Sequence, residues 1–153
     1  MEIRILPVLL DALHSAEESG IVPTVALSRL GEQYAESGEP EKAVSVLERA
    51  IRLDEQYFLE GYRGARRDRE RFGMHVNMGL ALASLGQLSL ASDHLNRALS
   101  FADNSADARA LAGSLSLQIG ELKTAADHFE RALELRPGWK DVEEDLERIR
   151  GMK

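Results

Sequence analysis

The fold is decided by residues 106–139, which read ADARALAGSLSLQIGELKTAADHFERALELRPGW. Apolar residues recur at spacings of three and four on both sides of Gly120, as one face of an α-helix requires. Gly120 separates the two periodic stretches, where a left-handed residue closes the last turn of a helix without a Cβ penalty. Pro137-Gly138 interrupts the second stretch. The segment therefore predicts two helices joined by a glycine turn.

The same unit occurs three times in the chain. Two glycines and an alanine recur in the same order, at an offset of 48 residues between the first and second copies and 34 between the second and third. The matched sets are Gly31, Gly79 and Gly113; Gly38, Gly86 and Gly120; and Ala43, Ala91 and Ala125. Such self-similarity indicates a helical repeat protein, in which neighbouring units stack to bury a common core.

Three of the repeated glycines, Gly31, Gly79 and Gly113, fall inside a helix rather than at its end. A glycine there costs about 1 kcal/mol relative to alanine, so its recurrence predicts a close crossing by a neighbouring helix. Alanines on either side of one large residue, seven residues apart, serve the same contact. These triplets are Ala43, Leu47 and Ala50; Ala91, Leu95 and Ala98; and Ala125, Phe129 and Ala132.

This order of small and large residues resembles the tetratricopeptide repeat family. The resemblance covers residues 24–57, 72–105 and 106–139. It departs at His75 and Arg109, which stand where the family usually has a tryptophan-like residue, and at Ser116, where a tyrosine would follow. The resemblance implies an all-α fold, an α-solenoid in which antiparallel helix pairs stack into a right-handed superhelix. It also implies that the first helix of each pair lines a concave face that binds peptides or proteins.

Helical spacing and the resemblance together place a set of residues on that concave face. They are Val25, Ser28, Arg29, Glu32, Glu36, Val76, Asn77, Leu80, Ser84, Asp107, Ala110, Leu111, Ser114 and Gln118. Family members that clamp the acidic C-terminal tails of heat-shock chaperones surround two asparagines with lysine and arginine. Only Asn77 matches that set, and Glu32 and Asp107 would repel such a tail.

Both ends of the chain are expected to form capping helices, over residues 1–23 and 140–153. An apolar stripe on each predicted helix would cover the outer faces of the repeats. The N-terminal stripe, on a helix from about Pro7 to Glu18, consists of Leu6, Leu9, Leu10, Leu13 and Ala16, and the C-terminal stripe consists of Val142, Leu146 and Ile149.

Residues 58–71 separate the first two units and have no counterpart between the second and third. Two interpretations remain open: a protruding helical hairpin that turns at 61–64, or a flexible loop. A hairpin would lengthen each flanking helix by roughly 10 Å, at 1.5 Å per residue. Aromatic residues beside arginines are typical of interface anchors, although the aromatics could equally pack the base of the hairpin. The candidate interface consists of Tyr57, Phe58, Tyr62, Arg63, Arg66 and Arg67.

The composition of the chain argues against several classes of function. The sequence has no cysteine, which excludes disulfides and thiolate metal sites, and no catalytic sequence motif, so we expect neither an enzyme nor a cofactor. The net charge of −7 disfavours nucleic acid as a partner. The apolar run over residues 6–10 is too short for a signal peptide or a membrane span, so we expect a cytoplasmic protein without membrane insertion.

Histidines offer one candidate metal pair, His94 and His128, which are equivalent residues one repeat apart. Neighbouring helix axes lie roughly 8–10 Å apart, too far for two imidazoles to share an ion without further ligands. We therefore predict no metal site and place both histidines on an outward helix face. Spacing gives His75 no partner.

The sequence thus predicts a non-catalytic adaptor or chaperone that holds an extended peptide or a helix in its groove. The alternative is a self-assembling scaffold, a homo-oligomer that uses the 58–71 insertion or the N-terminal helix. A third hypothesis, which the net charge opposes, is an RNA-binding module built on the arginines from Arg63 to Arg71.

Overall fold

The computed structural model describes residues 24–59, 65–102 and 104–152, together with Pro7, Asp11, His14 and Ser15. Within these residues the chain forms α-helices and no strand. The helices are α2 (Thr24–Glu36), α3 (Pro40–Leu59), α4 (Ala65–Ser84), α5 (Leu88–Phe101), α6 (Ala106–Ile119), α7 (Leu122–Leu135) and α8 (Lys140–Arg150). The capping helix expected from Pro7 to Glu18 falls almost wholly outside the described residues. The turn expected over 61–64 falls outside them as well.

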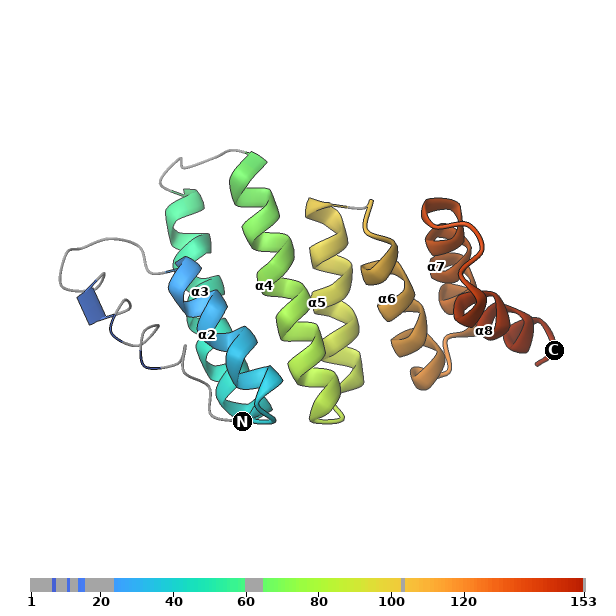
Figure 1. The fold of residues 1–153 in the computed structure, drawn as a ribbon, viewed down its shortest axis with the longest axis horizontal. Coiled ribbons are helices and arrows are strands. Elements are labelled where there is room, and N and C mark those ends of the chain that lie inside the picture. The colour runs from blue at the N-terminus through green and yellow to red at the C-terminus, as the bar shows by residue number, and fades with distance from the viewer. Residues whose placement is uncertain are drawn as a thin grey trace.

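The helices stack as pairs along one axis (Figure 1). The pairs are α2–α3, α4–α5 and α6–α7, and the second helix of each pair also packs against the helix that follows it in the chain. The last of these contacts is made by α8, which packs on α7 through Val142, Leu146 and Ile149. The predicted all-α solenoid of helix pairs is confirmed.

Glycines close the first helix of each pair. Gly38, Gly86 and Gly120 have φ values of 77°, 75° and 91°, in the left-handed region that a side chain would strain. At the end of α6, the amide of Gly120 donates to the Leu117 carbonyl at 3.1 Å and that of Glu121 donates to Ser116 at 2.9 Å. These bonds satisfy carbonyls that the end of a helix would leave open. The predicted turns are confirmed.

The repeated small residues lie where helices cross. All nine members of the alanine–large–alanine triplets are 0 % exposed. A Cβ added to Gly31 would lie 2.5 Å from Cγ of Leu47, and one on Gly113 would lie 2.6 Å from Cε1 of Phe129. Real Cβ atoms do not approach a neighbour so closely. The predicted close crossing is therefore confirmed, and the crossing partner is the second helix of the same pair.

The insertion changes the lengths of two helices. Both α3 and α4 contain 20 residues, whereas α5, α6 and α7 contain 14 each. Six additional residues add about 9 Å to a helix. In Figure 1 the start of α4 extends beyond the end of α5. The insertion therefore continues two helices of the solenoid, and residues 60–64 between them lie outside the described part.

Candidate functional site

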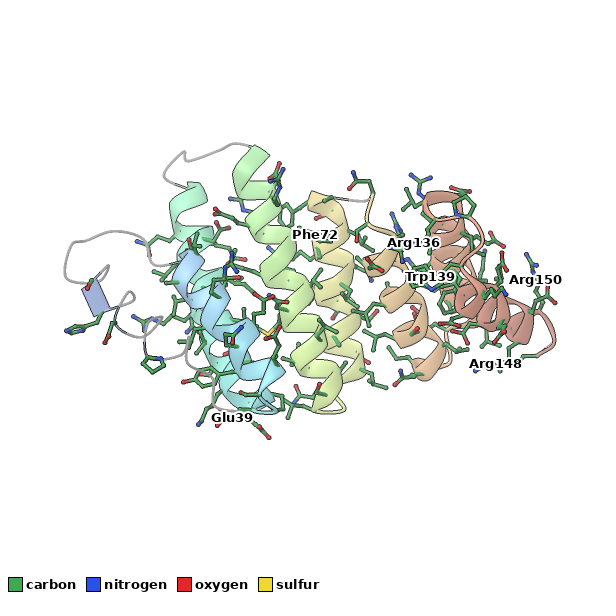
Figure 2. All side chains as sticks on the ribbon, viewed as in Figure 1. Glu39, Phe72, Arg136, Trp139, Arg148 and Arg150 are labelled. Atoms are coloured by element: carbon green, nitrogen blue, oxygen red, sulfur yellow. The ribbon has the colours of Figure 1, made fainter. Side chains whose placement is uncertain are left out.

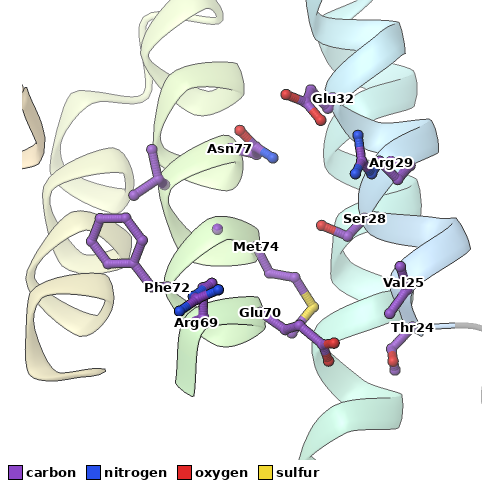
Figure 3. Close-up of a pocket in the computed structure, with 12 residues that line it drawn as sticks. Thr24, Val25, Ser28, Arg29, Glu32, Arg69, Glu70, Phe72, Met74 and Asn77 are labelled. Carbon is purple, nitrogen blue, oxygen red and sulfur yellow. The ribbon is translucent and has the colours of Figure 1, made fainter. Parts of the chain in front are cut away.

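A cavity of about 460 Å³ opens between α2 and α4, the first helices of the first two pairs. The two helices lie side by side; Met74 and Glu70 of α4 extend toward α2, whereas Phe72 lies on the opposite side of α4 (Figure 3). We call this site the α2–α4 groove. It is lined by Thr24, Val25, Ser28, Arg29 and Glu32 from α2, and by Arg69, Glu70, Phe72, Gly73, Met74, Val76 and Asn77 from α4.

Part of the predicted concave face lines this groove. The predicted residues among its lining are Val25, Ser28, Arg29, Glu32, Val76 and Asn77. The other predicted residues lie outside the lining. Of these, Glu36, Leu80, Ser84, Asp107 and Gln118 are exposed, whereas Leu111 and Ser114 are half-buried.

Ala110 corrects the predicted helix phase at one position. It is only 9 % exposed and belongs to a buried cluster with Ala125 and Phe129 of α7. The reason is that α6 buries residues against two neighbours: Ala108 and Ala112 pack in a separate cluster that includes residues of α5. The buried arc of α6 is therefore wider than one stripe, and Ala110 is not accessible to a partner.

Sequence reasoning missed half of the groove lining. Its α4 wall begins earlier than predicted, with Arg69 and Gly73, while the predicted wall began at Val76. Residues 69, 73, 77, 80 and 84 follow the helical spacing of four and three, so extending the stripe of Asn77 backwards would have found both. Arg69 was missed because groove residues were sought only within the unit that begins at residue 72, whereas α4 begins at Ala65. Gly73 lies inside that unit but has no side chain that would mark the face.

Charges in the groove are balanced. Arg29 and Glu32 contribute one charge of each sign from α2, and Arg69 and Glu70 do the same from α4. Asp107, an exposed acid of α6 that lies outside the groove lining, accepts two hydrogen bonds from Arg136, of 3.0 and 3.2 Å. The guanidinium of Arg136 also lies 4.2 Å from the centre of the Trp139 ring (Figure 2). The groove therefore shows no dominant charge to a ligand.

A histidine pair, of which His75 is buried and His94 half-buried, connects α4 and α5. The Nδ1 atoms of His75 and His94 are 3.0 Å apart, and the ring centroids are 5.2 Å apart with planes 25° from parallel. A hydrogen bond at this distance requires one ring to donate from Nδ1 and the other to accept. Burial lowers the pKa of His75 to about 4, helped by the positive charges of His94 and Arg97. Burial and Arg97 also lower the pKa of His94, so both rings are neutral at pH 7.

The predicted placement of the histidines is wrong. His75 does have a partner, and His94 and His128 are half-buried and turned toward the preceding helix. His128 faces Arg109, with 3.4 Å between Nη1 and Nδ1, and burial followed by Arg109 lowers its pKa. These contacts join residues 19 apart on crossing helices, a separation that helical spacing within one helix does not report.

A second cavity, of about 350 Å³, lies where α3, α4 and α5 meet beside the insertion. Its wall includes a buried ion pair in which Nε of Arg71 donates to the Asp54 carboxylate at 2.7 Å. Both side chains are 8 % exposed. Arg71 is therefore buried and cannot belong to the RNA-binding arginine cluster that the sequence suggested. Arg69, another member of that cluster, lines the α2–α4 groove.

The predicted insertion interface is not described at the level of side chains. Tyr57 and Phe58 lie in α3, and Arg66 and Arg67 lie in α4, but their side chains fall outside the described set, as do Tyr62 and Arg63 altogether. Among the residues that the structure does describe, no three His, Asp or Glu side chains form a group that could hold a metal ion. None of the described helices is long and apolar enough to cross a membrane.

Stacked antiparallel helix pairs with glycine turns define the class of α-helical repeat proteins. Models of the tetratricopeptide repeat match residues 26–57 and 106–138, the first and third pairs. No curated protein sequence matches the chain. The chain carries tetratricopeptide repeats at its first and third helix pairs, and repeats of this kind typically serve as non-catalytic protein-interaction scaffolds.

Solved structures share the fold at low sequence identity. MamA superposes with a TM-score of 0.76 at 20 % identity, over 95 % of this chain and 75 % of its own. YrrB, described as having an unusual peptide-binding site, gives 0.74 at 22 % identity, over 97 % and 67 %. The first repeat domain of Spaghetti (RPAP3), bound to the HSP90 peptide SRMEEVD, gives 0.67 at 19 % identity, over 84 % and 93 %. At these identities the similarity is one of fold.

Proposed function

We propose that this chain is a non-catalytic adaptor or chaperone that holds an extended peptide or a helix of a partner protein in the α2–α4 groove. The observation that carries the proposal is the groove itself, a cavity of about 460 Å³ between the first helices of adjacent pairs. Its size lies within the range of natural ligand sites. Peptide-bound relatives such as the Spaghetti (RPAP3) domain support the assignment by similarity of fold.

The groove combines the two kinds of contact that a peptide needs. Val25 is 49 % exposed although it is apolar, and Leu80, which lies one turn of α4 beyond Asn77 and outside the groove lining, is 42 % exposed. Large exposed apolar side chains gathered on one face are typical of binding surfaces. Asn77 is half-buried, and its amide can both donate to and accept from a peptide backbone. The mixed charges of the groove argue against an acidic tail as the ligand.

A selection from a displayed library of random 12-residue peptides tests this function. We expect peptides to be enriched on the immobilised protein and to be lost on the double variant Asn77→Ala, Leu80→Ala. Circular dichroism should show unchanged helicity for that variant, because neither side chain belongs to the buried core. Enriched peptides that bind the double variant as tightly as the parent would place the binding site elsewhere. A failure to enrich any peptide would refute the proposed peptide-binding function.

Self-assembly is the second candidate, favoured by the 20-residue lengths of α3 and α4. These helices extend past the 14-residue α5 and offer a second copy a surface that the repeat stack does not use. Light scattering over a range of concentrations measures the mass. A concentration-dependent mass that becomes monomeric when residues 57–67 are replaced by a Gly-Ser linker would support this candidate, and a constant monomer mass would exclude it.

A further inference from the structure

Gly73 is a glycine that the fold does not need. Gly31, Gly79 and Gly113 lie against large side chains of a crossing helix, and the turn glycines have positive φ. Gly73 lies inside α4 without a positive φ, and a Cβ added there would meet no atom of the described residues within 4 Å. A glycine inside a helix costs about 1 kcal/mol relative to alanine. Neither packing nor backbone conformation of the described residues offsets that cost.

The repeat itself shows that this position tolerates a side chain. At the offsets of 48 and 34 residues, Gly73 corresponds to Val25 in α2 and to Asp107 in α6. Val25 is 49 % exposed, and Asp107 is exposed and held by Arg136. The three positions occupy the same place on the first helix of each pair, and only the position in the middle pair, Gly73, has no side chain. Gly73 therefore leaves a notch in a row that otherwise carries side chains.

The notch opens into the α2–α4 groove, whose lining holds four apolar side chains beside polar and charged ones. Val25, Phe72, Met74 and Val76 line the groove together with Gly73. Met74 points across the groove toward α2 (Figure 3). Met74 is only 2 % exposed and belongs to the core, so Val25, which is 49 % exposed, and the half-buried Val76 offer the apolar contact. The groove charges, two positive and two negative, favour no charged side chain at this point.

We propose that Gly73 is a specificity-determining residue, the floor of a subsite that seats one uncharged, apolar side chain of the bound peptide directly on the backbone of α4. This inference rests on the proposed function and names the chemistry of its ligand. The occupant is a segment of a separate partner protein, anchored by that side chain between Val25 and Val76. A methyl group at position 73 would occupy the space that the anchor needs.

The test uses peptides selected from the random 12-residue library on the parent protein, measured by fluorescence polarisation. We expect the peptides to share one apolar residue, and Gly73→Ala to weaken their binding at least tenfold while melting no lower than the parent. Trimming the shared residue, for example from leucine to alanine, should then restore part of the affinity to Gly73→Ala only. Gly151→Ala is the matched control, because its Cβ makes only ordinary contacts, of 3.5 Å or more, at the end of α8.

The outcomes separate this inference from the function on which it rests. Peptides that are released by Asn77→Ala, Leu80→Ala but bind Gly73→Ala within twofold of the parent would leave groove binding intact and overturn the subsite. Peptides that survive the Asn77→Ala, Leu80→Ala change would overturn both. A synthetic peptide of residues 1–23 that displaces the selected peptides would assign the subsite to this chain's own N-terminal segment and overturn the choice of a separate partner.

Discussion

The same substitution at two glycines of α4 should change stability in opposite directions. A Cβ on Gly79 would lie 2.9 Å from Cγ of Leu95 and 3.2 Å from the Ala91 carbonyl oxygen, well inside normal contact distance. Leu95 is 0 % exposed, so it cannot move into solvent. Overpacking of this kind costs about 1–3 kcal/mol, and improved helix propensity offsets about 1 kcal/mol of it.

Gly73→Ala gains helix propensity without a clash, because a Cβ there meets no atom within 4 Å in the part of the chain that the structure describes. We expect it to stabilise the protein by up to about 1 kcal/mol and Gly79→Ala to destabilise it by up to about 2 kcal/mol, which is the overpacking cost less the gain in helix propensity. A difference of about 2 kcal/mol between the two variants corresponds to roughly 4–8 °C in Tm for a domain of this size. Thermal and urea unfolding followed by circular dichroism measure it. Equal stabilities for the two variants, or a loss at Gly73 alone, would refute the packing assignment.

Two further predictions concern the buried polar pairs. The pKa of His75 is lowered to about 4 in the folded protein from the ordinary 6.5, so between these pH values the unfolded chain binds more protons than the folded chain. The free energy of unfolding should therefore fall by up to about 3 kcal/mol as the pH drops from 6.5 to 4. The double variant His75→Leu, His94→Val, which copies Leu27 and Val46 of the first pair, should flatten this dependence in urea titrations at stepped pH, and an unchanged slope would assign it to other groups. Asp54→Ala should cost about 3 kcal/mol by removing the carboxylate that Arg71 contacts, and adding Arg71→Ser should recover part of that loss. A double variant less stable than the single one would contradict this.

The repeat explains why the fold could be predicted from sequence. A single mid-helix glycine or a single alanine carries little information, but three copies at the same place exclude chance and identify a common contact. Gly31, Gly79 and Gly113 could therefore be assigned to close crossings before their partners were known. The turn glycines were assigned in the same way, since only the left-handed region explains glycine at the end of three helices.

Features that occur in only one copy could not be predicted. The His75–His94 pair and the Asp54–Arg71 ion pair join residues 19 and 17 positions apart on different helices, so their geometry depends on helix phase and crossing rather than on spacing. Ala110 was misplaced for a related reason, since apolar residues surround much of α6. The contribution of α4 to the groove was underestimated because the insertion moves the start of the helix to Ala65.

The most direct test of the central claim is NMR mapping of a library-selected peptide on the isotopically labelled protein. We predict that the largest amide shifts occur on the two groove walls, at Val25 and Ser28 of α2 and at Gly73 and Asn77 of α4, while the buried positions Leu95 and Phe129 shift little. Shifts confined to α7 and α8, or to the helix ends that flank residues 60–64, with none in the groove, would contradict the account.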